Sequence, residues 1–114
     1  MANSELHAIT RVANIKVDIG NSERELEKVS KKLREINKQV SIFSKLQGRD
    51  FGSFSVSSQY RMAKDTGLTR SELASMNKRD LAARASAATA KSEEIKNKLL
   101  TTQGTLQKKI NNLL

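Results

Sequence analysis

The sequence contains no cysteine, no proline and no tryptophan, and each absence narrows what the chain can be. Without cysteine it has no disulfides, no thiolate metal site and no cysteine nucleophile. Without proline, nothing removes a backbone hydrogen-bond donor, so long uninterrupted helices are favoured. A chain of 114 residues is expected to form a single domain. Aromatic residues make up only 4% of it, which predicts a thin hydrophobic core.

Signals of catalysis and of membrane insertion are also missing. His7 is the only histidine and is expected at the surface, and no histidine pair or acidic cluster has metal-ligand spacing. We therefore expect no enzyme activity, no cofactor, no metal and no small-molecule substrate. No apolar run approaches the roughly 18 residues of a membrane helix, and no secretory signal is visible. The expected location is the cytoplasm, or export without a cleaved signal peptide.

The charge of the chain is strongly positive. Lys and Arg number 21 against 12 Asp and Glu, which gives +9 at pH 7. Residues 1–50 hold 10 basic and 7 acidic residues (+3), and residues 51–114 hold 11 and 5 (+6). Such an excess attracts nucleic acid, anionic lipid or an acidic protein. A solvated basic helix surface explains the same composition equally well.

Apolar residues recur every seven positions in the first half, in two series offset by three. The first series is Val12, Ile19, Leu26, Leu33 and Val40, and the second is Ile15, Ser22, Val29, Ile36 and Phe43. This alternation places both series on one seam of a helix that packs lengthwise against another helix. We predict a helix over about 4–47, ended by Gly48 in a left-handed cap.

The predicted helix contains one weak point, at Gly20 and Asn21. Both residues are poor in a helix interior, and Ser22 with Glu25 matches a capping box that would begin a new helix. Because the seam keeps its register across this point, a continuous or gently kinked helix is favoured. A break at Gly20–Asn21 is the alternative.

The second half is predicted to hold a loop with a short helix and then a second long helix. Residues 48–68 are rich in Gly and Ser, which favours a loop. Phe51 and Phe54 in this segment are expected to cover the end of the helix pair. The alternation of Phe54 and Val56 also allows a short extended piece at 54–56. Thr69 and Glu72 match a capping box that begins a helix over about 70–114. Asn77 offers a second cap, which would split off a short helix at 70–76.

These elements predict an all-α fold, a single domain over 1–114 in the form of a long antiparallel, coiled-coil-like helical hairpin. Two helices alone leave much apolar surface in water, so we expect oligomerisation or a helical protein partner. The predicted protein interface consists of Val12, Ile15, Ile19, Leu26, Val29, Leu33, Ile36, Val40 and Phe43 on the first helix, and Ile95, Leu99, Leu106 and Ile110 on the last.

Residues 59–78, "QYRMAKDTGLTRSELASMNK", resemble the DNA-binding helix-turn-helix. Ala63 matches the small residue of the first helix, Gly67 matches the turn, and the apolar positions are filled by Met62, Leu68, Leu73 and Met76. The resemblance covers 20 of 114 residues and implies a recognition helix in the major groove, with Arg70 as the best guanine reader. The implied nucleic-acid contacts are Arg61, Lys64, Thr69, Arg70, Ser71, Lys78, Arg79 and Arg84. A structural corner between two helices is the alternative.

Two functions follow from the sequence. The first is a non-enzymatic helical protein–protein interaction module, such as an oligomerising scaffold, an adaptor or a subunit of a secretion or phage/virion complex. The second is a small basic protein that binds DNA through residues 59–78 and dimerises through its long helices. The first is favoured, because commonplace residues are enough to match the helix-turn-helix motif.

Overall fold

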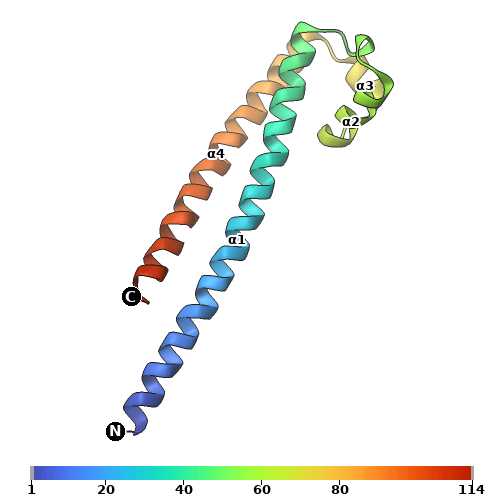
Figure 1. The fold of residues 1–114 in the computed structure, drawn as a ribbon. Coiled ribbons are helices and arrows are strands. Elements are labelled where there is room, and N and C mark those ends of the chain that lie inside the picture. Colours follow the sequence, from blue (N-terminus) through green and yellow to red (C-terminus); the bar gives the residue numbers. More distant parts are fainter. Residues whose placement is uncertain (1, 114) are drawn as a thin grey trace. The chain divides into compact units, whose positions relative to one another are not determined.

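The computed structural model describes the backbone of residues 2–113 and the side chains of residues 9–113. Its elements are α1 (Ala2–Gly48), the 3-10 helix η1 (Phe51–Ser53), α2 (Val56–Thr66), α3 (Arg70–Ser75) and α4 (Lys78–Asn111). The protein is 90% helical, with no strand among the described residues, and α1 packs against α4 (Figure 1). The predicted all-α hairpin is therefore confirmed. The expectation for the His7 side chain lies outside the described residues.

The chain divides into two compact units, and each contains a piece of both long helices. Unit 1 consists of Met1–Lys31 and Lys96–Leu114, and unit 2 consists of Lys32–Ile95. Unit 1 is a pair of helical segments from α1 and α4. Unit 2 contains the same two helices together with η1, α2 and α3.

Helix α1 runs without interruption through Gly20 and Asn21, so the alternative of a break there is wrong. Ser22 does not cap a new helix. Its side chain is 7% exposed and accepts a hydrogen bond of 2.9 Å from Lys109 Nζ in α4. The one polar position in the seam is thus paired across the two helices of unit 1.

The corner between α2 and α3 is built from local hydrogen bonds. Gly67 ends α2 with φ of 71°, and its N–H donates to the Ala63 carbonyl at 3.0 Å. Thr69 begins α3 with the predicted capping box. The Glu72 N–H donates to Thr69 Oγ1 at 3.1 Å, and the Thr69 N–H donates to Glu72 Oε1 at 3.2 Å.

The predicted helix over 70–114 is two helices, so the single-helix boundary is wrong and the alternative split is confirmed. Helix α3 ends at Ser75, and Met76 is extended with φ of −71° and ψ of 130°. The Asp80 N–H then donates to Asn77 Oδ1 at 2.8 Å, which satisfies a donor in the first turn of α4. At its other end, α4 ends at Asn111.

Unit 2 has a hydrophobic core that draws on all five elements. Its buried members are Ile42, Phe43, Leu46, Phe51, Met62, Leu73, Leu81 and Ala85, and Phe54, Ala63, Leu68 and Met76 pack against them. Leu73 in the short α3 is only 2% exposed. Phe51 and Phe54 join this core, as expected. The backbones of Phe54 and Ser55 are extended and α2 begins at Val56, so the extended alternative at 54–56 holds for two of its three residues.

Two glycine substitutions should act in opposite directions. Gly67→Ala forces a side chain into the left-handed region and should lower the free energy of unfolding by about 1 kcal/mol. Gly104→Ala, in the interior of α4 with open space around it, should raise that free energy by up to about 1 kcal/mol. Urea unfolding followed by circular dichroism measures both. Stabilisation by Gly67→Ala would contradict the corner geometry.

Candidate interaction surfaces

The heptad seam lies where α1 and α4 pack together. Val29, Ile36 and Phe43 are buried, whereas Val12 is 44% exposed. The other predicted interface residues are half-buried: Ile15, Ile19, Leu26, Leu33, Val40, Ile95, Leu99, Leu106 and Ile110. Their contribution to the contact between the two helices is visible in their burial. A role in binding another chain stays a prediction.

The two units differ in how well the seam is covered. In unit 2, the core residues of η1, α2 and α3 add apolar surface to the two long helices. In unit 1, only Ser22 and Val29 are buried among the residues whose side chains are described. Ile9, Val17 and Leu100 are exposed there by 67%, 62% and 65%. Unit 1 is therefore a helix pair with a largely uncovered apolar surface.

Polar pairs join α1 to α4 in both units, and one in each is formed by a buried serine of the described chain. In unit 1, Lys109 donates to Ser22, as described above. In unit 2, the hydroxyl of Ser92 donates to Asn37 Oδ1 at 2.7 Å, and Ser92 is 4% exposed. A shift of either helix along the other would leave a buried hydroxyl without its partner, at a cost of about 1–3 kcal/mol. These pairs therefore favour one register of the hairpin.

The segment that resembles a helix-turn-helix has the expected turn but a short second helix. Helix α3 contains six residues, which is less than two helical turns. Its buried residue, Leu73, points into the core of unit 2. Helix α3 therefore offers only a short surface for contact with a groove of DNA.

Arg70, the predicted guanine reader, is held by α2. Its Nη2 donates to Gln59 Oε1 at 2.7 Å, and its guanidinium lies 4.4 Å from the centre of the Tyr60 ring. Gln59 is itself 8% exposed and donates through Nε2 to the Phe54 carbonyl at 3.0 Å. The Nε of Arg70 is buried without a hydrogen-bond partner in the described chain. In this arrangement Arg70 joins α3 to α2, and one of its guanidinium nitrogens is held by Gln59.

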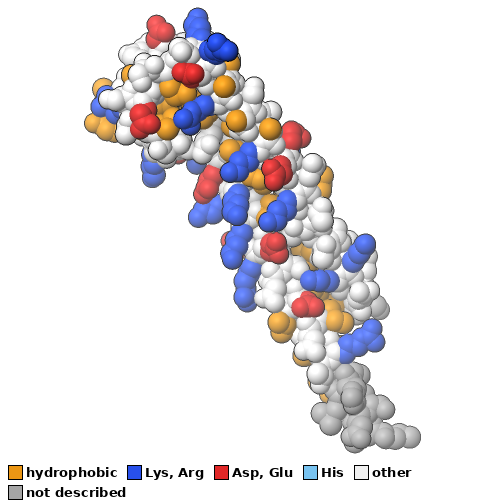
Figure 2. Space-filling view, turned by 180° about the vertical axis from the view of Figure 1, so that it is seen from behind, with side chains coloured by type: hydrophobic (Ala, Val, Ile, Leu, Met, Phe, Trp, Pro, Cys, Tyr) orange, Lys and Arg blue, Asp and Glu red, His pale blue; other side chains and the backbone are white. Residues whose placement is uncertain are grey.

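The other implied nucleic-acid contacts are exposed on several elements: Arg61, Lys64, Thr69, Ser71, Lys78, Arg79 and Arg84. The Thr69 hydroxyl is already used in the cap of α3. On the face shown in Figure 2, Lys and Arg side chains are interspersed with Asp and Glu side chains. The basic residues thus raise the general potential of the surface without forming a single patch on that face.

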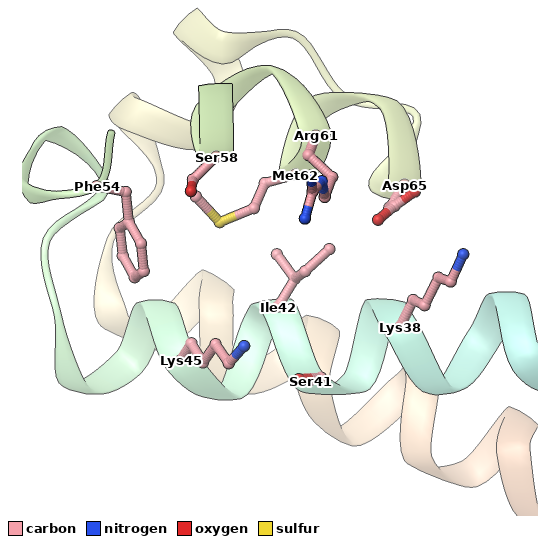
Figure 3. Close-up of a pocket in the computed structure, with 9 residues that line it drawn as sticks. All are labelled: Lys38, Ser41, Ile42, Lys45, Phe54, Ser58, Arg61, Met62 and Asp65. Carbon is pink, nitrogen blue, oxygen red and sulfur yellow. The ribbon is translucent and has the colours of Figure 1, made fainter. Parts of the chain in front are cut away.

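A pocket of about 300 Å³ lies between α1 and α2 in unit 2 (Figure 3). It is lined by Lys38, Ser41, Ile42, Lys45, Phe54, Ser58, Arg61, Met62 and Asp65. Among them, the sequence drew attention to Phe54, Arg61 and Met62, for other reasons. Ile42 and Leu46 lie four residues apart and outside the heptad series, which marks a second apolar face on α1 but not a pocket.

The described residues contain no group of His, Cys, Asp or Glu that could hold a metal ion. In the same part of the chain, no helix combines the length and apolar character needed to cross a membrane. Comparison of the chain with models of known protein families, with curated proteins and with solved structures finds no match.

Arg70→Ala should destabilise the protein whether or not nucleic acid is present. Loss of the hydrogen bond to Gln59 and of the contact with Tyr60 should lower the free energy of unfolding by about 2 kcal/mol. Arg79→Ala removes the same type of charge from an exposed position and should change that energy by less than about 0.5 kcal/mol. Urea unfolding in nucleic-acid-free buffer compares the two. Equal stability of both variants would contradict a structural role for Arg70.

Proposed function

We propose that the protein is a non-enzymatic helical interaction module that oligomerises through unit 1. The observation that carries this proposal is the incomplete burial of the heptad seam in unit 1. The pattern from Val12 to Val29 is that of a helix packed along its whole length, yet only Ser22 and Val29 are buried there. A module of this kind serves as a scaffold, an adaptor or a subunit of a larger assembly, such as a secretion or phage/virion complex.

Burial energetics support an assembly of more than two helices. Full burial of a Val, Leu or Ile side chain stabilises by about 1.5–3 kcal/mol. Unit 1 leaves Val12 and Leu100 exposed and Ile15, Ile19 and Leu106 half-buried. A second helix pair laid against this surface would convert a two-helix arrangement into a four-helix bundle, which buries an apolar face on every helix.

The charge pattern of unit 1 favours a second copy of the chain as the partner. Residues 1–31 contain five basic and five acidic residues, whereas residues 96–114 contain four basic and no acidic residues. If α4 of one copy lies beside α1 of the other, its lysines face a segment of balanced charge and not each other. A two-fold symmetric dimer makes this contact twice.

Solution mass tests the proposal directly. The chain has a mass of 12.7 kDa, so the wild-type protein should show at least twice that value by sedimentation at micromolar concentration. The double variant Ile19→Asp with Leu26→Asp places two carboxylates in the seam and should return the mass to that of a monomer, with reduced helicity. The double variant Ala13→Asp with Asn21→Asp adds the same charge at exposed positions and should keep the oligomer.

A further variant separates assembly from folding. Val12→Lys with Leu100→Lys changes two residues that are already exposed by 44% and 65% in the single chain. It should dissociate the oligomer while keeping wild-type helicity per residue at low concentration. A wild-type protein that stays monomeric at several hundred micromolar would rule out self-association through unit 1.

DNA binding is retained as a second candidate because Lys64, Lys78 and Arg79 are exposed near the helical corner. With Arg70 engaged by α2, such binding would rest on phosphate contacts and would show little base preference. Lys78→Ala with Arg79→Ala should then weaken binding to all duplexes alike and reduce the salt dependence by about two phosphate contacts. Fluorescence anisotropy at several salt concentrations measures this. Failure of the wild-type protein to bind duplex DNA at low salt would eliminate the candidate.

A further inference from the structure

We infer that the pocket between α1 and α2 is a docking site for an acidic segment of a partner protein, which inserts one large apolar side chain between the two helices. Every residue that lines the pocket belongs to unit 2. The inference therefore does not depend on self-association through unit 1, and either proposal can fail without the other.

The floor of the pocket is apolar. Figure 3 shows Ile42 of α1 and Met62 of α2 facing each other, with the Phe54 ring at one end. Ile42 and Met62 are 8% and 7% exposed and belong to the core of unit 2, so the floor is rigidly supported. A dry cavity of about 150 Å³ holds a benzene molecule. A pocket of about 300 Å³ therefore has room for a large aromatic or aliphatic side chain.

The rim of the pocket is basic. Lys38 and Lys45 come from α1, and Arg61 and Asp65 come from α2, which leaves a net charge of +2 around the opening. No hydrogen bond or ion pair within the described chain engages any of these three cations. The hydroxyls of Ser41 and Ser58 add donors on the same rim, and Ser58 Oγ already accepts from Ser55, so its own proton can point outward.

Some other cations of the described chain do have partners within it. Arg49 donates to Ser53 Oγ at 2.8 Å and lies 4.2 Å from the centre of the Phe54 ring. Arg70 bonds Gln59, and Lys109 bonds Ser22. The chain thus uses several basic side chains internally, whereas those on the pocket rim remain available to carboxylates from outside.

The combination of an apolar floor and a basic rim selects an acidic peptide over the other anions. Asp65 repels phosphates and carboxylates alike, so the floor decides between them, and a nucleic-acid backbone has no large aliphatic group to place there. A small ligand normally has 70–90% of its surface buried, and it would require a more enclosed site than this open groove. A peptide buries one side chain in the pocket and keeps its carboxylates at the rim, where the charges are complementary.

The test uses methyl NMR of the full chain, with the Ile42 and Met62 methyl groups as reporters. The probe is a capped pentapeptide with a central tryptophan and two acidic residues on each side. It should shift both methyl signals in a saturable manner, and added salt should weaken the binding. A control peptide with alanine in place of the tryptophan tests whether binding requires a large apolar side chain on the floor. A second control peptide, with the tryptophan and four lysines, tests whether binding requires acidic residues at the basic rim. Neither should bind.

Charge reversal on the pocket supplies the matched variants. Lys38→Glu with Lys45→Glu should lower the affinity for the acidic tryptophan peptide at least tenfold. Lys64→Glu with Lys78→Glu makes the same change in net charge at exposed positions outside the pocket and should keep the affinity within about twofold. Backbone amide spectra establish that both variants are folded.

Several outcomes would overturn the inference. If the lysine peptide binds as tightly as the acidic one, the basic rim does not select the peptide by charge. If sodium phosphate alone causes methyl shifts as large as those from the acidic peptide, or if duplex DNA causes larger ones, the pocket is a binding site for phosphate groups. Saturable shifts on raising the concentration of the protein without peptide would assign it to a second copy. The absence of methyl shifts at millimolar acidic peptide would exclude the docking site.

Discussion

The lengthwise packing of α1 against α4 is the contact on which the other features depend. An isolated helix is marginal in water, and most of its stability in a protein comes from burial of an apolar face. In unit 2 that face gains η1, α2 and α3 as additional cover, and a compact core results. In unit 1 the same face has only the opposite helix. The difference arises because the chain between α1 and α4 packs entirely within unit 2.

The sequence predicts features that depend on neighbouring residues or on a regular period. The heptad series located α1, and the capping residues Thr69 and Asn77 marked the starts of α3 and α4. It did not predict contacts between residues far apart in the chain. Lys109 reaches Ser22 across 87 positions, and Arg70 reaches Gln59 across the corner. Such contacts depend on how the helices pack, which no local pattern records.

The pocket illustrates the same limit. It forms because α2 packs beside α1 along Ile42 and Met62, and its basic rim combines side chains from both helices. On either helix alone, the lysines and the arginine are ordinary surface charges. Ile42 and Leu46, outside the heptad series, indicated that α1 has a second packing partner near its end. They gave no indication of a pocket or of its charge.

The helix-turn-helix resemblance shows why a motif of packing residues is weak evidence for DNA binding. Ala63, Gly67 and Leu73 match the motif because a tight corner between two helices requires a small residue, a left-handed turn and a core residue. The structure meets all three requirements for packing alone. Arg70, the residue that would carry base recognition, is directed to Gln59 and Tyr60.

The two polar pairs between α1 and α4 limit the ways in which the chain can assemble. Exchange of α4 between two copies would have to break the bonds from Lys109 to Ser22 and from Ser92 to Asn37 and then form them again between chains. Addition of one intact hairpin to another leaves both pairs in place and covers only the residues that are still exposed. Because the second route breaks no buried hydrogen bond, association of complete hairpins should be faster than exchange of helices. The same polar pairs that favour one register within the chain are thus compatible with the proposed association through the uncovered seam of unit 1.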